Sequence, residues 1–385
     1  MSDHGRCEVR RLSDAGTRRA WLEVPKSIHA TDAAWICPLD IVEKQRIAPG
    51  HNPFFEAGEA EFFVAYRNGV PAGRISAQIN RRHLERHRDA TGHFGFFDCI
   101  DDPVVARALV REAESWLAAR GMTAMQGPFN LSVNQDTGLL TSGFEHRPTI
   151  MTSHAGVWTG SLLEACGLEK VMDFYAYRMN PVAMPDKARR LADLARASGR
   201  LEIRNIDMTN YAAEARLIFD IFNDAWSDNW GFVPISDSEA VMLAAEMKPI
   251  MRSKFAWIVE IDGEPAAMMV VLPDLNEVIG PFNGRLLPLN WAKLAYAIWR
   301  DDWRTARVPL LGIRRKHRST PIAAGALSVL VAGMMELGRQ YRIDWVEYSW
   351  VLESNAPMVA LAELLAGKPA KIYRAYGKSL QGSTA

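Results

Sequence analysis

Cysteine is scarce in this chain of 385 residues, which has four, at positions 7, 37, 99 and 166. None forms a Cys-x-x-Cys pair, which excludes the common zinc-ribbon spacing and a disulfide framework. Isolated cysteines fit a reducing compartment, and residues 1–16 lack the apolar core of a signal peptide. The sequence therefore predicts a cytoplasmic protein, and no metal is expected.

An excess of charge of either sign is also absent, because 45 basic residues balance 45 acidic ones. Nucleic-acid-binding proteins usually carry a basic excess, so we expect no nucleic-acid partner. A hydrophobic fraction of 48% and a charged fraction of 23% are ordinary for a globular protein and argue against disorder. At roughly 100–200 residues per domain, the length predicts two or three domains.

No apolar run reaches the about 20 residues that a membrane-spanning helix needs. The run nearest to this limit, residues 321–335 (PIAAGALSVLVAGMM), is shorter and rich in alanine and glycine. It predicts a buried helix packed closely against a sheet. The alternative is a helix that contacts a lipid chain or a membrane, which would bring the protein to the inner face of the membrane as a peripheral partner.

An internal repeat organises the chain. Residues 61–79 and 255–273 each read as strand, tight turn and strand, with Asn68-Gly69 and Asp262-Gly263 as strong β-hairpin turn signals. Each hairpin is followed by a strand, a helix, a strand, a short helix and a last strand. The strand, helix and strand cover 92–99, 104–122 and 124–129 in the first half, and 307–313, 322–341 and 344–350 in the second. The short helix and the last strand together cover 161–179 and 358–378.

The repeat predicts an α/β protein of two tandem lobes, each with a mixed, largely antiparallel sheet flanked by helices. We expect an N-terminal lobe over 1–180, a helical connector over 181–200 and a C-terminal lobe over 201–385. The second lobe would begin with a strand over 201–206 and a helix over 210–226, capped by Asp207 or Thr209.

This element order, together with residues 311–327 (LGIRRKHRSTPIAAGAL), resembles the GNAT superfamily of acyl-CoA-dependent N-acyltransferases. The chain also resembles a double-lobed bacterial group of GNAT proteins that includes bacterial ceramide synthases. The segments that carry this resemblance are residues 52–75, 94–102, 349–358 and 371–380. The superfamily resemblance implies that acyl-CoA is the co-substrate and that a primary amine attacks it directly. The narrower resemblance implies a long-chain fatty acyl group and a lipid-like, sphingoid-type acceptor.

In GNAT proteins the coenzyme A pyrophosphate binds between the fourth strand and the following helix, whose first N–H groups and dipole favour an anion. The superfamily also splays its fourth and fifth strands to admit the pantetheine arm. The resemblance carries these roles to Arg315, Lys316, His317, Arg318, Ser319, Thr320, Ile322 and Ala323, with Asn355 at the start of a later helix. Ser319 and Pro321 replace the family's glycines, and Pro321 lacks an N–H. The alternative is a solvated basic run ahead of a helix.

The matching junction of the first lobe carries Asp101 and Asp102 instead of a basic run. Carboxylates there cap a helix well but repel a pyrophosphate. We therefore expect the first lobe not to bind coenzyme A, and either to shape the acceptor site or to be structural.

Acyl transfer to an amine needs a group that accepts the ammonium proton and a donor for the leaving thiolate. Glu347 on the fifth strand of the second lobe, and Glu353 just past it, are the candidate bases; each could instead be a solvated surface residue. The superfamily's acid is a tyrosine in the next helix, which this chain lacks. Tyr373, with Tyr376, replaces it by position only.

Two further features bear on the acceptor. Residues 127–138 form a polar loop with Asn130, Asn134, Gln135 and Asp136, which can line a pocket or only satisfy its own turn. His154 could face the same space, although a single histidine is more often structural. Aromatic residues between 226 and 303 suit an apolar substrate, and core packing explains them equally well.

Two other functions remain open at this stage. One is a non-catalytic protein that binds coenzyme A or a lipid, which the replaced glycines and the missing tyrosine favour. The other is an aminoacyl or peptidyl transferase. It would need a surface for transfer RNA, against which the neutral charge balance argues.

Overall fold

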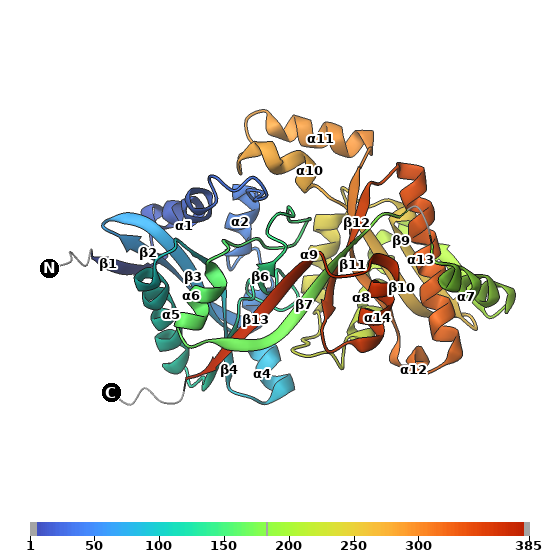
Figure 1. Ribbon diagram of the computed structural model, residues 1–385, viewed down its shortest axis with the longest axis horizontal. Helices are drawn as coiled ribbons and strands as arrows, with labels where there is room; N and C mark the ends of the chain where they lie inside the picture. Colours follow the sequence, from blue (N-terminus) through green and yellow to red (C-terminus); the bar gives the residue numbers. More distant parts are fainter. Residues whose placement is uncertain (1–5, 182–183, 381–385) are drawn as a thin grey trace. The chain divides into compact units, whose positions relative to one another are not determined.

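The computed structural model describes residues 6–181 and 184–380 (Figure 1). The chain forms two compact units. The first comprises Met1–Phe174, Ile279–Trp291 and Lys371–Ala385, and the second comprises Tyr175–Val278 and Ala292–Ala370. Each unit contains one copy of the repeated hairpin, so the predicted organisation into two α/β lobes is confirmed.

The first unit is built on a sheet with the strand order β1-β2-β3-β4-β5-β13. β4 and β5 are parallel, and the other neighbours in this series are antiparallel. The strands are β1 (Cys7–Arg11), β2 (Gly58–Arg67), β3 (Val70–Asn80), β4 (Thr91–Cys99), β5 (Ala124–Gly127) and β13 (Lys371–Ser379), with β6 (Leu139–Ser142) also paired to β13. The helices are α1 (Ala15–Ile28), α2 (Asp40–Arg46), α3 (Phe54–Ala57), α4 (Arg81–His87), α5 (Pro103–Ala118) and α6 (Thr159–Ala165).

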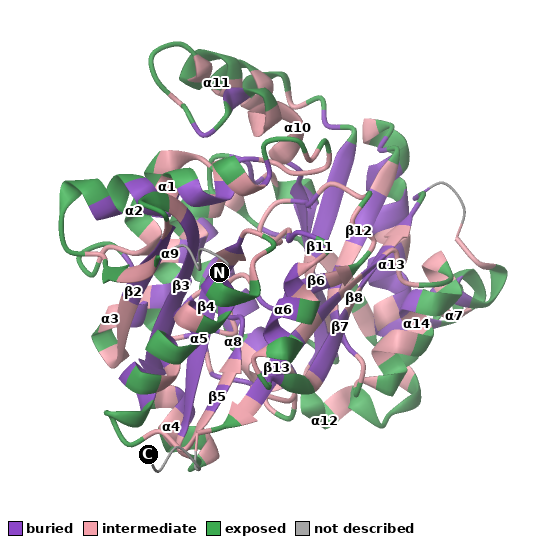
Figure 2. Ribbon diagram, turned by 60° about the vertical axis from the view of Figure 1, so that its left-hand side comes forward, coloured by how far each residue is buried: buried purple, intermediate pink, exposed green. Residues whose placement is uncertain are grey.

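Helices α1 and α5 cover opposite faces of this sheet. Trp21 of α1 packs on Phe62 and Val64 of β2. On the other face a Cβ at Gly73 of β3 would lie 2.7 Å from Leu109 of α5, so glycine allows the helix to approach. Figure 2 shows the strands as the most buried part of the unit.

The second unit has the strand order β12-β11-β10-β9-β8. β11 and β12 are parallel and the remaining pairs are antiparallel. The strands are β8 (Leu201–Asn205), β9 (Ala256–Ile261), β10 (Glu264–Pro273), β11 (Thr305–Ile313) and β12 (Trp345–Leu352). The helices are α7 (Asp186–Ala197), α8 (Tyr211–Ala225), α9 (Asp237–Met247), α12 (Arg315–Arg318), α13 (Pro321–Tyr341) and α14 (Ala356–Ala366).

Three elements run from one unit into the other along the chain: β7 (Glu169–Met179), α10 (Asn276–Ile279) and α11 (Asn290–Arg300). Within the second unit, α8 and α13 lie on opposite faces of the sheet. Leu311 of β11 lines an apolar pocket with Met334 of α13. Its neighbour Gly312 lies against Trp226, directly after α8. Successive strand residues point to opposite faces, which explains the arrangement.

The two hairpin turns form as the sequence predicts. Asn68 and Gly69 have φ of 53° and 82°, and Asp262 and Gly263 have φ of 53° and 83°. Positive φ at both central positions is the type I′ turn, whose twist matches that of the flanking strands. The predicted cap is refined: Asp207 caps a single 3₁₀ turn, Met208–Asn210, by accepting from the Thr209 N–H, and α8 begins after it.

The terminal strand β13 belongs to the first unit, although it ends the second half of the repeat. It runs antiparallel to β5, with Tyr376 opposite Gly127, and to β6, with Tyr373 opposite Leu140. The repeat and the compact units therefore differ at this strand. The alternation of side chains predicts that this segment is a strand, but not which strand it pairs with. The sequence alone therefore does not reveal that β13 belongs to the first unit.

Helix α13 contains the apolar run. By length and composition it could cross a membrane, and it is the one helix among the described residues of which this is true. However, 61% of its most apolar 18-residue window is buried. It packs on α7 and on the sheet of the second unit, as expected. A Cβ at Gly325 would lie 2.6 Å from Ala195 of α7, and one at Gly338 would lie 2.4 Å from Pro181. Small residues thus allow the close packing.

Candidate functional site

Strands β11 and β12 of the second unit separate part-way along their length. Their parallel pairing runs from Thr305 opposite Trp345 to Val308 opposite Tyr348, while both strands continue beyond this register. A cavity of about 20 Å³ lies beside the separation. Its walls include Val308, Leu311, Met334, Tyr348, Ala362 and Tyr177. This is the splay that the sequence resemblance implies.

Tyr177 of β7 places a hydroxyl group in this apolar environment. The side chain is fully buried, and its hydroxyl has no hydrogen-bond partner among the described residues. Burial, with a smaller effect of Glu363, raises the pKa of Tyr177 to about 12. The group is therefore a neutral O–H donor at physiological pH, able to donate to a carbonyl oxygen or a thiolate. Sequence reasoning did not single it out.

The basic run lies at the carboxyl end of β11, in α12 and before α13. Each of its cations pairs with a carboxylate. Arg315 Nε is 3.3 Å from Asp224 Oδ1, and Arg318 Nη1 is 3.2 Å from Asp228 Oδ2. Arg314 pairs with Asp220 and Lys316 pairs with Glu264. Surface ion pairs of this kind are weak, so a phosphate group can compete for the cations.

The remaining residues predicted to bind the cofactor follow this run. The Thr320 hydroxyl donates to the His317 carbonyl at 2.5 Å, and Ser319 is exposed. His317 is half-buried, and burial together with Lys316 lowers its pKa, which favours the neutral ring. Ile322 and Ala323 lie in the first turn of α13. Residues 315–323 thus gather at one helix start.

Asn355 lies at a different helix start. It caps α14 by accepting from the Met358 N–H at 3.4 Å, as the sequence predicts. Glu353 is half-buried, between β12 and this helix. Whether either residue contacts a ligand stays a prediction.

Glu347 is completely buried, so the solvated alternative is excluded for it. Its Oε2 is 3.1 Å from Arg178 Nε, and its Oε1 accepts from Ser349 Oγ at 3.4 Å. Ser349 Oγ in turn accepts from Arg307 Nε at 3.0 Å. Because Tyr348 faces the cavity, Glu347 and Ser349 point to the opposite face of β12. A buried carboxylate in such a network is held in place by its partners.

The structure places Tyr373 and Tyr376 in the first unit, on β13, whereas Glu347 and Glu353 belong to the second unit. Both tyrosines are buried, and the Tyr376 hydroxyl donates to Glu164 at 3.2 Å. The acid role of Tyr373 stays a prediction.

The first unit has its own cavity, of about 100 Å³. Asn130 and Asp136 of the polar loop line it together with His154, so the loop and the histidine do face one space. Asp102 caps α5 by accepting from the Val104 N–H at 2.8 Å, and it pairs with Arg67. Asp102 therefore caps the helix, as the sequence predicts, and it also forms an ion pair.

Several charged residues of these sites were not predicted from the sequence, among them Arg74 on β3 and Arg307 on β11. Both are buried, with exposed fractions of 6% and 2%. A lone charge within an otherwise apolar strand is expensive to bury without a partner. That pattern is the signal that could have identified them.

No family model matches the sequence. The chain is 37% identical over 366 residues to "Bacterial ceramide synthase" of Caulobacter vibrioides, which covers 94% of both chains. It is 35% identical over 374 residues to "Protein YghO" of Escherichia coli, covering 97% of this chain and 95% of that protein. The chain belongs to the family of the bacterial ceramide synthase.

Solved structures confirm the fold of this family member. A tandem GNAT protein from the clavulanic acid biosynthesis pathway matches with a TM-score of 0.57 at 14% identity, over 98% of this chain and 100% of that one. A GCN5-related glucosamine N-acetyltransferase region of a fungal β-N-acetylglucosaminidase matches with a TM-score of 0.57 at 10% identity, over 97% of this chain and 38% of that one. The predicted double-lobed GNAT fold is thus confirmed.

Proposed function

We propose that this protein is an N-acyltransferase that moves an acyl group from acyl-CoA to a primary amine by direct attack. The observation that carries the proposal is the separation of β11 and β12 next to a helix start that follows a basic run. In this proposal the separation admits the pantetheine arm, and the cations of the same unit bind the pyrophosphate. The relative named as a bacterial ceramide synthase supports the same reaction class.

The finer proposal is a long-chain fatty acyl donor and a sphingoid-type acceptor. The relative's name and the apolar walls beside the separated strands support it. Both substrates would be amphiphilic, so peripheral contact with the inner face of a membrane is part of this proposal. In the reaction the amine nitrogen forms a bond to the thioester carbon, and the carbon–sulfur bond breaks. In this proposal the Tyr177 hydroxyl, which is buried and has no hydrogen-bond partner among the described residues, donates to the carbonyl oxygen or the departing sulfur.

A non-catalytic protein that binds acyl-CoA is the second candidate. It is favoured by the carboxylates that already neutralise Arg315, Lys316 and Arg318, and by a cavity of only about 20 Å³. An enzyme turns over acyl-CoA and a binding protein does not, and the experiment described next measures this difference.

The test is calorimetric titration with acetyl-CoA and palmitoyl-CoA, followed by an assay of free thiol release with sphinganine as acceptor. The variant is Arg315→Ala/Arg318→Ala. Arg304→Ala is the matched control, because Arg304 is another exposed, ion-paired arginine of the same unit. Loss of charge-assisted phosphate contacts should weaken binding of both thioesters about tenfold or more, and the control should bind as the parent protein does.

The outcomes separate the candidates. Equal affinity in the double variant and the control would show that coenzyme A does not bind at residues 315–323. Binding of palmitoyl-CoA without thiol release would favour the non-catalytic protein. If the parent protein bound neither thioester, both candidates would be lost.

A further inference from the structure

Helix α11 presents large apolar side chains to the solvent. None of its 11 residues is buried, and Figure 2 colours most of the helix as exposed. Trp291, Tyr296 and Trp299 are 53%, 57% and 77% exposed, and they are the only exposed tryptophan, tyrosine or phenylalanine side chains in the described part of the chain. Leu287 and Leu289, just before the helix, are each 72% exposed. A concentration of exposed apolar side chains of this kind indicates an interaction surface.

The aromatic side chains share one side of α11. With 3.6 residues per turn, Trp291, Tyr296 and Trp299 span about 140° of the helix circumference. The rings of Tyr296 and Trp299 have their centres 5.9 Å apart. On the adjoining side, Leu294 and Ile298 are half-buried. The inward side of the helix is thus apolar, as expected, but the outward side is aromatic where a surface helix normally carries polar residues.

The carboxyl end of α11 fixes the helix to the second unit. Arg252 Nη2 donates to the Ile298 carbonyl at 2.9 Å, and the Asp301 N–H donates to the Ala297 carbonyl at 3.1 Å. Asp301 in turn accepts from Trp303 Nε1 at 3.0 Å. These hydrogen bonds hold the end of the helix by its backbone and leave its outward aromatic side chains uncovered.

The charge around these aromatic residues has one sign. Residues 279–300 contain three basic residues, Arg285, Lys293 and Arg300, and no aspartate or glutamate. Arg300 pairs with Asp302 at 2.6 Å. Arg285 and Lys293 are exposed, and neither forms an ion pair with a described residue. Exposed cations without a carboxylate partner suit a surface of negative charge.

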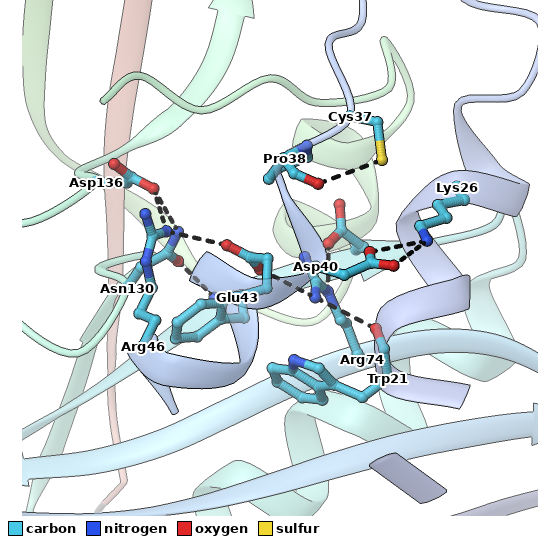
Figure 3. A network of polar contacts seen from close by, with 12 residues as sticks. Trp21, Lys26, Cys37, Pro38, Asp40, Glu43, Arg46, Arg74, Asn130 and Asp136 are labelled. Carbon is cyan, nitrogen blue, oxygen red and sulfur yellow. Dashed lines mark hydrogen bonds and ion pairs between the residues drawn. The ribbon is translucent and has the colours of Figure 1, made fainter. Parts of the chain in front are cut away.

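The cations at the two cavities and at the basic run are arranged differently. In the first unit Arg74 Nε is 2.7 Å from Asp98 Oδ2, and Arg46 Nη1 is 2.5 Å from Asp136 Oδ2 (Figure 3). The basic run before α13 is paired with carboxylates as well. Those cations are partly neutralised within the protein, whereas the charges of Arg285 and Lys293 are available to an external anion.

We propose that α11 docks on the surface of an anionic lipid bilayer. Its tryptophan and tyrosine rings lie at the level of the lipid headgroups, where such side chains are enriched, and Lys293 and Arg285 lie beside the lipid phosphates. Helices with an apolar aromatic side and basic residues bind in the plane of the membrane interface. A protein partner fits less well, because lysine is depleted from protein interfaces. The inference deepens the proposed function and rests on its amphiphilic substrates for the choice of a lipid surface.

Membrane contact through α11 leaves α13 in the core. The sequence offered residues 321–335 as the alternative segment for lipid contact, but α13 packs on α7 and on the sheet of the second unit. Most of its apolar window is therefore unavailable to a membrane. The short, exposed α11 needs no rearrangement of the core to reach lipid.

The test is co-sedimentation of the full chain with vesicles in the absence of both substrates. Phosphatidylcholine vesicles are compared with vesicles in which about one-third of the lipid is phosphatidylglycerol. We expect binding to the anionic vesicles that weakens about tenfold or more in about 1 M salt, because salt screens the cations. Trp291→Ser/Trp299→Ser should weaken binding about tenfold or more by removing the inserted rings. Lys293→Glu should weaken it about fivefold or more.

Two control variants match these changes elsewhere on the surface. Val157→Ser removes an apolar side chain that is 67% exposed, and Arg216→Glu reverses an exposed cation of α8. Both should bind vesicles as the parent protein does. Thermal unfolding at the parent temperature shows that each variant is folded. As a second measurement, brominated lipids should quench the tryptophan fluorescence of the parent protein more than that of the double tryptophan variant.

Three results would overturn the inference. They are a parent protein that does not bind the anionic vesicles, equal vesicle affinity in the double tryptophan variant and Val157→Ser, and a parent dimer in analytical ultracentrifugation that the double variant no longer forms. In the last case a second copy of the chain covers α11. Vesicle binding without thiol release would remove the proposed function and support the inference, whereas thiol release without vesicle binding would remove the inference alone.

Discussion

At the scale of single residues, the buried histidines of the first unit link the fold to pH. His93 of β4 is buried, and its ring lies 4.6 Å from that of His83. Burial lowers the pKa of His93 well below its ordinary value, and the nearby His83 and His87 add to this. A histidine whose pKa is lower in the folded protein than in the unfolded chain stabilises the fold only while it is neutral. That stability is lost as the pH falls below about 6.5, the ordinary histidine value.

We predict that His93→Phe makes stability less dependent on pH. Phenylalanine keeps the aromatic packing against Phe129, 5.4 Å away between ring centres, but takes up no proton. Between pH 7.5 and 5.5 the free energy of unfolding should fall by about 1 kcal/mol less in the variant than in the parent protein. Urea denaturation at both pH values measures the difference. Parallel losses would show that His93 is not a source of the acid sensitivity.

Residue-scale features were predictable from sequence where their partners are close along the chain. The turn at Asn68-Gly69 and the cap at Asp102 depend on residues two or three positions away, and both form as expected. The contact between Asp32 and His154 joins residues 122 positions apart. Only the fold brings them together, so His154 looked like an isolated histidine in the sequence. The same holds for Tyr177, whose surroundings come from several strands and helices.

At the scale of elements, the glycines of α13 set how closely it packs. Gly325 faces Ala195 of α7, and an added Cβ would lie 2.6 Å from the Ala195 Cβ. We predict that Gly325→Leu lowers the free energy of unfolding by about 2 kcal/mol, because overpacking outweighs the gain in helix propensity. Ala324→Leu, at an exposed position of the same turn, should change stability little. Thermal unfolding of both variants tests this, and equal effects would contradict the packing argument.

The composition of this helix allowed its burial to be predicted, but not its partner. Residues 186–197 read as a polar connector, and the alanines that meet α13 are a minor part of that segment. Helix and strand bounds were predicted well wherever hydrophobic periodicity was strong. By contrast, α1 and α9 were not predicted, because neither belongs to the repeated pattern from which the elements were derived.

At the scale of the whole molecule, the fold of the first unit depends on the last strand of the chain. β13 pairs with both β5 and β6, and it buries Tyr373 and Tyr376 at exposed fractions of 0% and 1%. Losing one large buried aromatic side chain costs about 3–5 kcal/mol, against a typical stability of about 5–15 kcal/mol for a domain. A chain ending at residue 370 should therefore lose the first unit while its second unit persists.

Hydrogen exchange measures the two units separately in that truncated chain. We expect amides of β3 and β4 to lose their protection, whereas those of β9 and β10 keep it. A chain ending at residue 380 is the control, since it retains all of β13 and should exchange like the full protein. Unchanged protection of β3 in the shorter chain would mean that β13 is dispensable. Loss of protection there would mean that residues 1–180 cannot fold as a domain by themselves, because the strand that completes their sheet is encoded at the other end of the chain.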